Sequence, residues 1–260
     1  MRKPNLKPIK YSQLAKADYN RKISRKKVDR IISQFNEKEI RPVVVSWRSG
    51  KYFIIDGQHT ALAIYEKSGN NKDVIIWCDV YENLSYTEEA RLFVKMNTNG
   101  TSANKNEAIY GNLCGEDPDA IEFQRVVLNS GLHIGAGTNG IRTPSVPYKI
   151  FENDKANGTN NLSHVLRLIA MTWPDSTIAT QSVIIKGLNI LVSNHSKTLI
   201  DARFINRLTG MPIKALKNEA KSKAAEVREN TNHAMYRVFC KYYNSGPKTK
   251  GFIKIIPVDS

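Results

Sequence analysis

Residues 54–60 read Ile54-Ile55-Asp56-Gly57-Gln58-His59-Thr60, an apolar strand end that passes directly into a turn and a helix start. Residues 61–65 continue with apolar side chains at helical spacing, and Gly69 is a suitable helix end. The first N–H groups of such a helix lack intrahelical partners, and the helix dipole adds partial positive charge there. Phosphate binds readily in that position. The stretch therefore predicts a phosphate-binding turn.

Each residue of the turn has a candidate role. Gly57 would allow close backbone approach and an unusual φ. Gln58 and His59 could donate hydrogen bonds to phosphate or ribose oxygens, and Asp56 could cap the helix or help to hold a metal ion. The plainer alternative is that Asp56 is an N-cap, Gly57 a turn residue and His59 an exposed first-turn side chain.

The segments around the turn predict alternating helices and strands. Ser24 can cap a helix that ends near Phe35, and Ser85 with Glu88 forms a capping box for a helix that ends at Asn97. Glu88 and Glu89 are weak candidates for catalysis, since the first has a capping role and the second is expected to face solvent. The expected strands are 43–47, 52–55 and 74–80, the first two forming a hairpin.

The chain beyond residue 105 predicts mainly helices, punctuated by prolines. The expected helical segments are 105–114, 118–130, 161–172, 180–193, 199–208, 213–229 and 231–243. We therefore predict an α+β fold: a small mixed sheet with helices over 1–105 that includes a basic N-terminal arm, and a mainly α-helical domain over 106–260.

The order of elements and the stretch "IIDGQHTALA" resemble the ParB N-terminal/sulfiredoxin superfamily over about residues 15–105. The stretch is similar to the "DGQHR" signature of the DndB-like branch, and "RLFVKMNTNG" is similar to the family's helix ending at an asparagine. The resemblance implies that the protein binds a nucleoside triphosphate with Mg²⁺. It also implies a function on DNA, in partition, in DNA modification or in a phage or mobile element. The phosphate-binding residues it implies are Asp56, Gly57, Gln58, His59, Thr60, Arg21, Asn97 and Asn99.

Two departures limit what the resemblance implies. Sulfiredoxin chemistry needs a cysteine in this turn, and none is present, so that activity is not expected. Thr60 stands where the related motifs have an arginine, which removes a planar phosphate clamp. Nucleotide affinity would then be weaker, or another basic group would supply the charge, for which Arg21 is the candidate. A solvated arm residue is the alternative for Arg21.

The charge of the chain favours a polyanionic partner. The net charge is +15 and the pI is about 9.7. The N-terminal basic cluster, defined as Lys22, Arg25, Lys26 and Lys27, is the candidate nucleic-acid contact. A second basic stretch runs from Lys214 to Lys254. Simple solubilisation by these charges is the alternative.

Other features narrow the class of protein. No window is apolar and long enough to span a membrane, and no secretory core follows the first residues, so a cytoplasmic protein is expected. The three cysteines are far apart, and the histidines lack ligand spacing, so no metal site is assigned. The sequence leaves open whether the protein forms a homodimer, and no helix-turn-helix motif is evident in it.

Three functions remain in competition. The first is a nucleotide-binding ParB-like protein that acts on or with DNA, with hydrolysis of the nucleotide left open. The second is a non-enzymatic DNA-binding regulator that has kept the fold without nucleotide chemistry. The third is a metal-dependent nuclease, for which Asp56, His59 and Asp79 are the only grouping.

Overall fold

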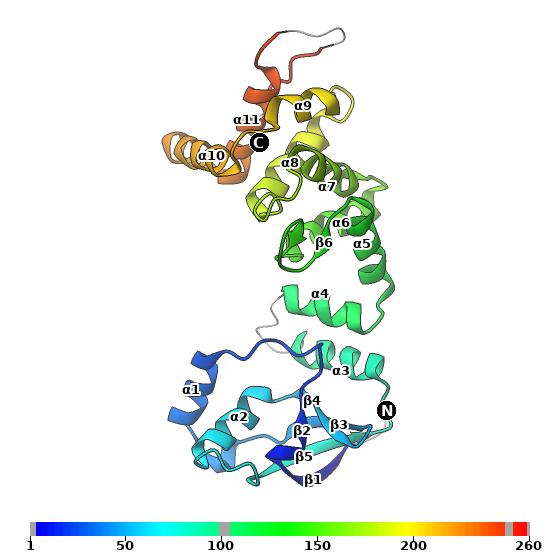
Figure 1. The fold of residues 1–260 in the computed structure, drawn as a ribbon, viewed down its shortest axis with the longest axis vertical. Coiled ribbons are helices and arrows are strands. Elements are labelled where there is room, and N and C mark those ends of the chain that lie inside the picture. The colour runs from blue at the N-terminus through cyan, green and yellow to red at the C-terminus, as the bar shows by residue number, and fades with distance from the viewer. Residues whose placement is uncertain (1–3, 99–104, 248–251, 259–260) are drawn as a thin grey trace. The chain divides into compact units, whose positions relative to one another are not determined.

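The computed structural model describes residues 4–98, 105–247 and 252–258, and the chain divides into two compact units, residues 1–120 and 121–260. The first unit holds a five-stranded mixed sheet with helices, and the second is mainly helical (Figure 1). The expected α+β fold class is confirmed. Helix α4 (Lys105–Cys114) begins at residue 105, where we expected the first domain to end, and it packs on α3 (Tyr86–Thr98) within the first unit.

The sheet of the first unit is built around the expected hairpin. Its strands are β1 (Asn5–Lys10), β2 (Leu14–Ala15), β3 (Val43–Arg48), β4 (Lys51–Asp56) and β5 (Ile75–Glu82), in the order β1-β5-β3-β4-β2. β1 with β5 and β3 with β4 are antiparallel, while β5 with β3 and β4 with β2 are parallel. Ser49 and Gly50 join β3 to β4 with φ of 51° and 78°, the positive values that a two-residue hairpin turn requires.

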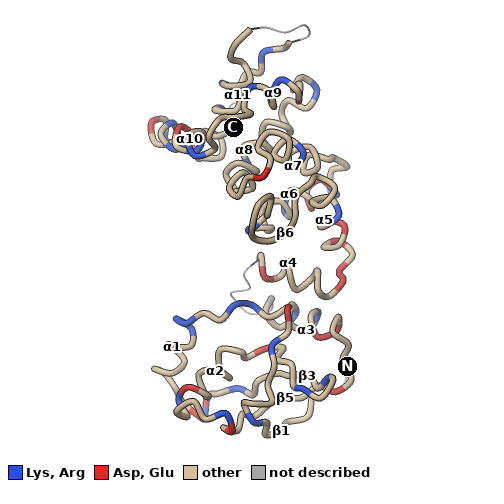
Figure 2. The backbone as a smooth tube through the Cα atoms, in the orientation of Figure 1, with Lys and Arg blue, Asp and Glu red and all other residues tan. Residues whose placement is uncertain are grey.

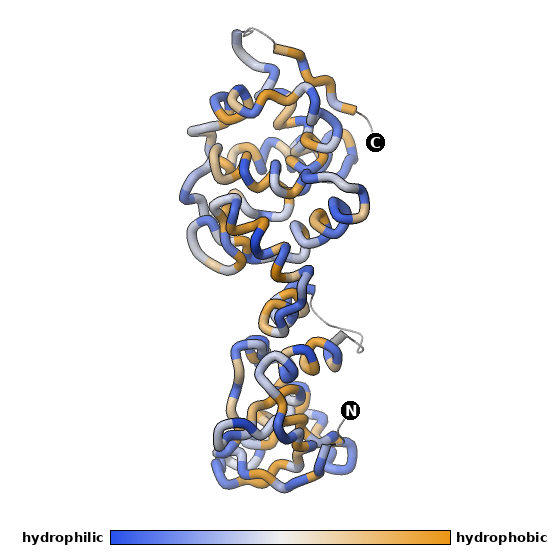
Figure 3. Tube along the Cα trace, turned by 90° about the vertical axis from the view of Figure 1, so that its right-hand side faces the viewer, coloured by the Kyte–Doolittle hydropathy of each residue, from blue (hydrophilic) through white to orange (hydrophobic). Residues whose placement is uncertain are grey.

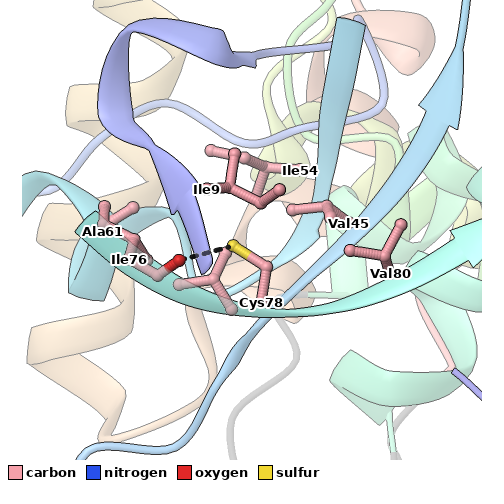
Figure 4. Packing of buried hydrophobic residues seen from close by; sticks show 8 residues of the cluster. Ile9, Val45, Ile54, Ala61, Ile76, Cys78 and Val80 are labelled. Carbon is pink, nitrogen blue, oxygen red and sulfur yellow. Dashed lines mark hydrogen bonds between the residues drawn. The ribbon is translucent and has the colours of Figure 1, made fainter. Parts of the chain in front are cut away.

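One face of the sheet packs against α2 (Gln58–Lys67). On β5, Ile76, Cys78 and Val80 point to this face, as the period of two in a strand requires. They meet Ala61 of α2 in the cluster shown in Figure 4. Burial raises the pKa of the Cys78 thiol to about 12, so this cysteine behaves as an apolar core residue.

The other face packs against α3 and contains a buried ion pair. Glu89 is fully buried, accepts from the Tyr19 hydroxyl at 3.2 Å, and receives Nε and Nη2 of Arg48 at 3.0 and 3.3 Å. Burial and the Glu89 carboxylate raise the pKa of Tyr19. The expectation that Glu89 faces solvent is wrong, because Arg48 supplies a charge partner on β3. The Ser85–Glu88 capping box is confirmed, with both reciprocal bonds present.

Helix α1 (Arg25–Ser33) lies before β3 and packs lightly. Val28 is its one fully buried residue in the described chain, and the helix rests mainly on α2. Ser24 occupies the expected N-cap position, but its side chain makes no hydrogen bond to the helix, so it does not cap α1 as expected.

The second unit is a set of helices with a short parallel ladder. Its elements are α5 (Pro118–Asn129), which spans the division, β6 (His133–Ile134), β7 (Gly140–Ile141), α6 (Ser145–Asn157), α7 (Asn161–Thr172), α8 (Ser182–His195), α9 (Asp201–Leu208), α10 (Ile213–Val227) and α11 (Thr231–Asn244). Hydrophobic residues recur along these helices between hydrophilic ones (Figure 3). No described helix is long and apolar enough to cross a membrane.

Candidate functional site

The predicted phosphate-binding turn forms as a direct strand-to-helix connection. β4 ends at Asp56, Gly57 is the N-cap of α2 with φ of 89°, and the helix begins at Gln58. Asp56 is therefore not the N-cap, and no side chain caps this helix. A Cβ on residue 57 would lie 3.3 Å from Cα of Val43, so both the left-handed φ and the close approach of β3 require glycine here.

The uncapped start of α2 opens into a cavity of about 710 Å³. Its walls come from the arm before α1, from α1 and the segment that follows it, and from the end of β4 with the start of α2. The lining residues are Asn20, Arg21, Lys27, Arg30, Ile31, Gln34, Phe35, Asn36, Glu39, Ile40, Arg41, Pro42, Ile55, Asp56, Gly57, Gln58, His59, Thr60 and Phe93. All five residues of the predicted turn and Arg21 thus line one cavity.

The charged groups of the cavity are mostly cationic. Arg21, Lys27, Arg30 and Arg41 face only two carboxylates, those of Glu39 and Asp56. The basic residues come from the arm, from α1 and from the segment before β3. Figure 2 shows blue stretches along the arm and at α1. Together with the partial positive charge at the start of α2, they favour an anionic ligand.

Arg21 is partly neutralised by another element. Its Nη1 lies 3.3 Å from Oε2 of Glu107 on α4, and the two side chains are partly buried, with 18% and 31% exposed. The alternative that Arg21 is only a solvated arm residue does not fit this burial.

Gln58 and His59 hold the arm instead of pointing freely into the cavity. Gln58 donates from Nε2 to the backbone oxygen of Arg21 at 3.1 Å, and the Ser24 backbone N–H donates to Nε2 of His59 at 3.0 Å. Both side chains are buried, with 7% of each exposed. The alternative of an exposed first-turn histidine is therefore wrong. Gln58 Oε1 is buried without a partner among the described residues.

His59 is neutral at ordinary pH. Burial lowers its pKa to about 4, with the nearby charges of Arg21, Lys27 and Lys16 adding to the effect and Asp56 opposing it. Because Ser24 occupies the lone pair of Nε2, this nitrogen neither donates to phosphate nor serves as a general base in this arrangement.

Not all of the remaining predicted phosphate-binding residues line the cavity. Thr60 lines the cavity. Asn97 is not among the lining residues, and its Nδ2 donates to the backbone oxygen of Phe93 at 2.8 Å. Asn99 lies outside the described residues.

Only part of the N-terminal basic cluster lies at the cavity. Lys22 and Lys26 are exposed and lie outside the cavity, whereas Lys27 lines it. Arg25 donates to both oxygens of Glu66 on α2 at 2.5 and 2.6 Å and also pairs with Asp29, so its charge is largely compensated.

Arg30 and Arg41 were missed by sequence reasoning. Lys27, Arg30 and Gln34 follow one another at helical spacing on one side of α1, and this spacing was the available signal for Arg30.

The geometry does not favour a metal-dependent nuclease. The described residues contain no group of three His, Cys, Asp or Glu side chains able to hold an ion.

Comparisons with other proteins give a family match and weak structural likenesses. The chain is similar at 14% identity to the C-terminally truncated chromosome-partitioning protein ParB from Caulobacter crescentus complexed with CTP-gamma-S, over 71% of this chain and 98% of that chain, with a TM-score of 0.32. That score and identity are too low to carry a fold or a ligand over to this chain. No curated protein matches. A family model described as a family of unknown function matches residues 14–255, and the chain therefore belongs to that family, DUF6551.

Proposed function

We propose that the first unit is a ParB/sulfiredoxin-like nucleotide-binding domain and that the protein acts on or with DNA. The observation that carries the nucleotide half is the uncapped start of α2, which opens into a cavity lined by Arg21, Lys27, Arg30 and Arg41. Unsatisfied N–H groups, a helix dipole and flanking cations are what a phosphate chain needs.

The cavity has room and chemistry for more than phosphate. Its volume of about 710 Å³ falls in the range of small-molecule sites. Away from the helix start, Ile31, Phe35, Ile40 and Pro42 supply apolar surface on which a base can pack. A nucleotide would thus place its phosphates at the start of α2 and its base between α1 and the segment before β3.

A magnesium ion bound with the phosphates would meet oxygen ligands here. Asp56 and Glu39 are the carboxylates of the cavity, and carboxylate oxygen is a preferred ligand of Mg²⁺. The ion would neutralise part of the phosphate charge. Hydrolysis has no residue assigned to it, since the histidine of the turn already accepts a hydrogen bond from Ser24.

The proposed function is tested by thermal shift with a panel of nucleoside di- and triphosphates, with and without Mg²⁺. A ligand that binds only the folded chain must raise its melting temperature. The variant Lys27→Gln/Arg30→Gln removes two charges from the cavity wall and should lose the shift. Lys22→Gln/Lys26→Gln removes two exposed charges from the same segment and should keep it.

A non-enzymatic DNA-binding regulator is the second candidate function. It is favoured by Thr60 in place of the motif's arginine and by Gln58 and His59, whose side chains hold the arm. Absence of a shift with every nucleotide would reject the nucleotide half and favour this regulator. The N-terminal basic cluster is its proposed DNA contact, and replacing all four residues with Gln should weaken duplex binding and its dependence on salt.

A further inference from the structure

Helix α10 presents one side to the core of the second unit and leaves the other uncovered. Ile213, Leu216, Ala220 and Ala224 are buried, and the helix packs against α11. These positions repeat with the period of an α-helix, so they form one stripe. The opposite side of the helix is exposed along its length.

The uncovered side carries basic residues at helical spacing. Lys214 and Lys221 are exposed, and exposed Arg228 follows as the C-cap. The three positions are seven residues apart, which brings them near one line of the helix. The line is about 21 Å long at 1.5 Å per residue. Among the described residues, none of the three forms a salt bridge.

The neighbouring lysines already have partners. Lys217 bonds to Gln181, and Lys223 pairs with Glu219 at 3.7 Å. Lys241 of α11 shares the same carboxylate at 2.7 Å. At about 100° per residue, Lys223 lies on nearly the opposite side of the helix from Lys214. The basic line therefore differs from the rest of α10 in having no internal partner.

The start of α10 adds a second anion-attracting feature. Pro212 is the N-cap, no acidic residue lies in the first turn, and no side chain caps the helix. A cavity of about 510 Å³ surrounds this end and includes Lys214. Thr172 Oγ1 and Trp173 Nε1, from two buried residues that line it, lack hydrogen-bond partners within the described chain.

We propose that this basic line, Lys214, Lys221 and Arg228, together with the start of α10, binds the phosphates of duplex DNA. The exposed side chains nearest the basic line are short, namely those of Asn218, Ser222 and Ala225, whereas exposed Glu226 lies about a third of a turn from Lys214. The helix can therefore approach a groove closely along this line. The major groove of B-DNA admits an α-helix, whereas that of duplex RNA is too narrow. The proposal deepens the DNA half of the proposed function and is independent of the nucleotide half.

The test measures duplex binding by fluorescence anisotropy over a range of salt concentrations. The variant Lys214→Gln/Lys221→Gln/Arg228→Gln should bind about tenfold or more weakly, with a salt slope smaller by about 2.7. The control Lys155→Gln/Lys223→Gln/Lys241→Gln removes the same charge from lysines already paired with carboxylates. It should keep the parent's affinity within about twofold and most of its salt slope.

Three results would overturn the proposal. One is a triple variant that binds like the parent, and another is a control that loses as much affinity, which would show a general effect of net charge. The third is duplex RNA bound as tightly as DNA. Nucleotide-induced thermal shifts, measured on the same proteins, should not change with the α10 variant, so failure of the nucleotide site is seen separately. Melting temperatures close to the parent's show that all variants fold.

Discussion

The backbone N–H of Ser24 donates to Nε2 of His59 over 3.0 Å, and this bond ties the start of α1 to the start of α2. The bond from Gln58 to the Arg21 oxygen lies beside it. The two bonds fix the arm along the rim of the cavity, although α1 itself buries little. A ligand in the cavity would therefore contact a preset wall at the arm and a lightly packed one at α1.

The first prediction concerns the pH dependence of stability. The pKa of His59 is about 4 in the folded chain and about 6.5 when unfolded, so the unfolded chain takes up a proton first as the pH falls. The stability that neutral His59 contributes is complete above pH 6.5, is lost between 6.5 and about 4, and falls no further below that. The loss should reach roughly 2 kcal/mol by pH 5, measured by urea unfolding from pH 7.5 to 5.

Two variants isolate His59 in that experiment. His59→Gln cannot titrate and should flatten the slope between pH 7 and 5, whereas His195→Gln should remove a smaller part, since burial lowers the pKa of His195 as well. Glu66, Glu82 and Glu219 have lowered pKa values, so they weaken stability only below their ordinary titration range. If His59→Gln leaves the slope of stability against pH unchanged, His59 is not a buried, neutral hydrogen-bond acceptor in the folded chain.

The second prediction separates backbone strain from close approach at Gly57. Gly57→Ala meets both a positive φ and Val43 at 3.3 Å, whereas Gly69→Ala meets only a positive φ of 74° with open space around it. Strain alone costs about 1 kcal/mol, and the crowded site should cost about 2 kcal/mol or more. Equal losses in urea unfolding would mean that β3 does not restrict residue 57.

The third prediction concerns the buried carboxylate on α3. Glu89→Gln removes the charge opposite Arg48 and should destabilise the first unit by about 3 kcal/mol. Glu82→Gln breaks the exposed pair with Lys7 and should cost much less, because solvent screens exposed pairs. Chemical unfolding that shows no difference between the two variants would contradict the burial of Glu89.

The fourth prediction restores the guanidinium that the related motifs carry. Thr60 lines the cavity, so Thr60→Arg should tighten triphosphate binding by about tenfold, because a planar cation can bind phosphate through two donors. Thr60→Gln adds a polar side chain without charge and should bind like the parent. Titration calorimetry measures both. If the parent binds no nucleotide and Thr60→Arg confers none, the phosphate-site proposal is wrong.

Periodicity and turn chemistry predicted much of the fold. The strand-turn-helix at residues 54–60 and most helices beyond 105 follow from local patterns, and the structure has them at nearly the expected bounds. β1 was missed because Ile9 is its one buried residue and Pro8 interrupts the pattern. α6 was missed because Pro147 was taken as a break, although a proline is tolerated in the first turn of a helix.

The orientation of site side chains could not be predicted. Gln58 and His59 bond to backbone groups 37 and 35 residues away in sequence, and no local pattern identifies such partners. The burial of Glu89 depends in the same way on Arg48, 41 residues earlier. The turn residues and Arg21 line one cavity, which agrees with the sequence interpretation that they belong to one site. The role of each residue in binding stays a prediction.

The contact between Tyr19 and Glu89 joins residues 70 positions apart, and this spacing affects how the first unit forms during synthesis. At ordinary translation speed, about 4 to 14 s pass between the two residues. For most of that time β1 has no complete β5 to pair with, and Tyr19 has no carboxylate partner until Glu89 is made. Until β5 is complete, Ile9 and the unpaired edge of β1 stay exposed, and an unpaired strand edge is a site where chains can associate wrongly.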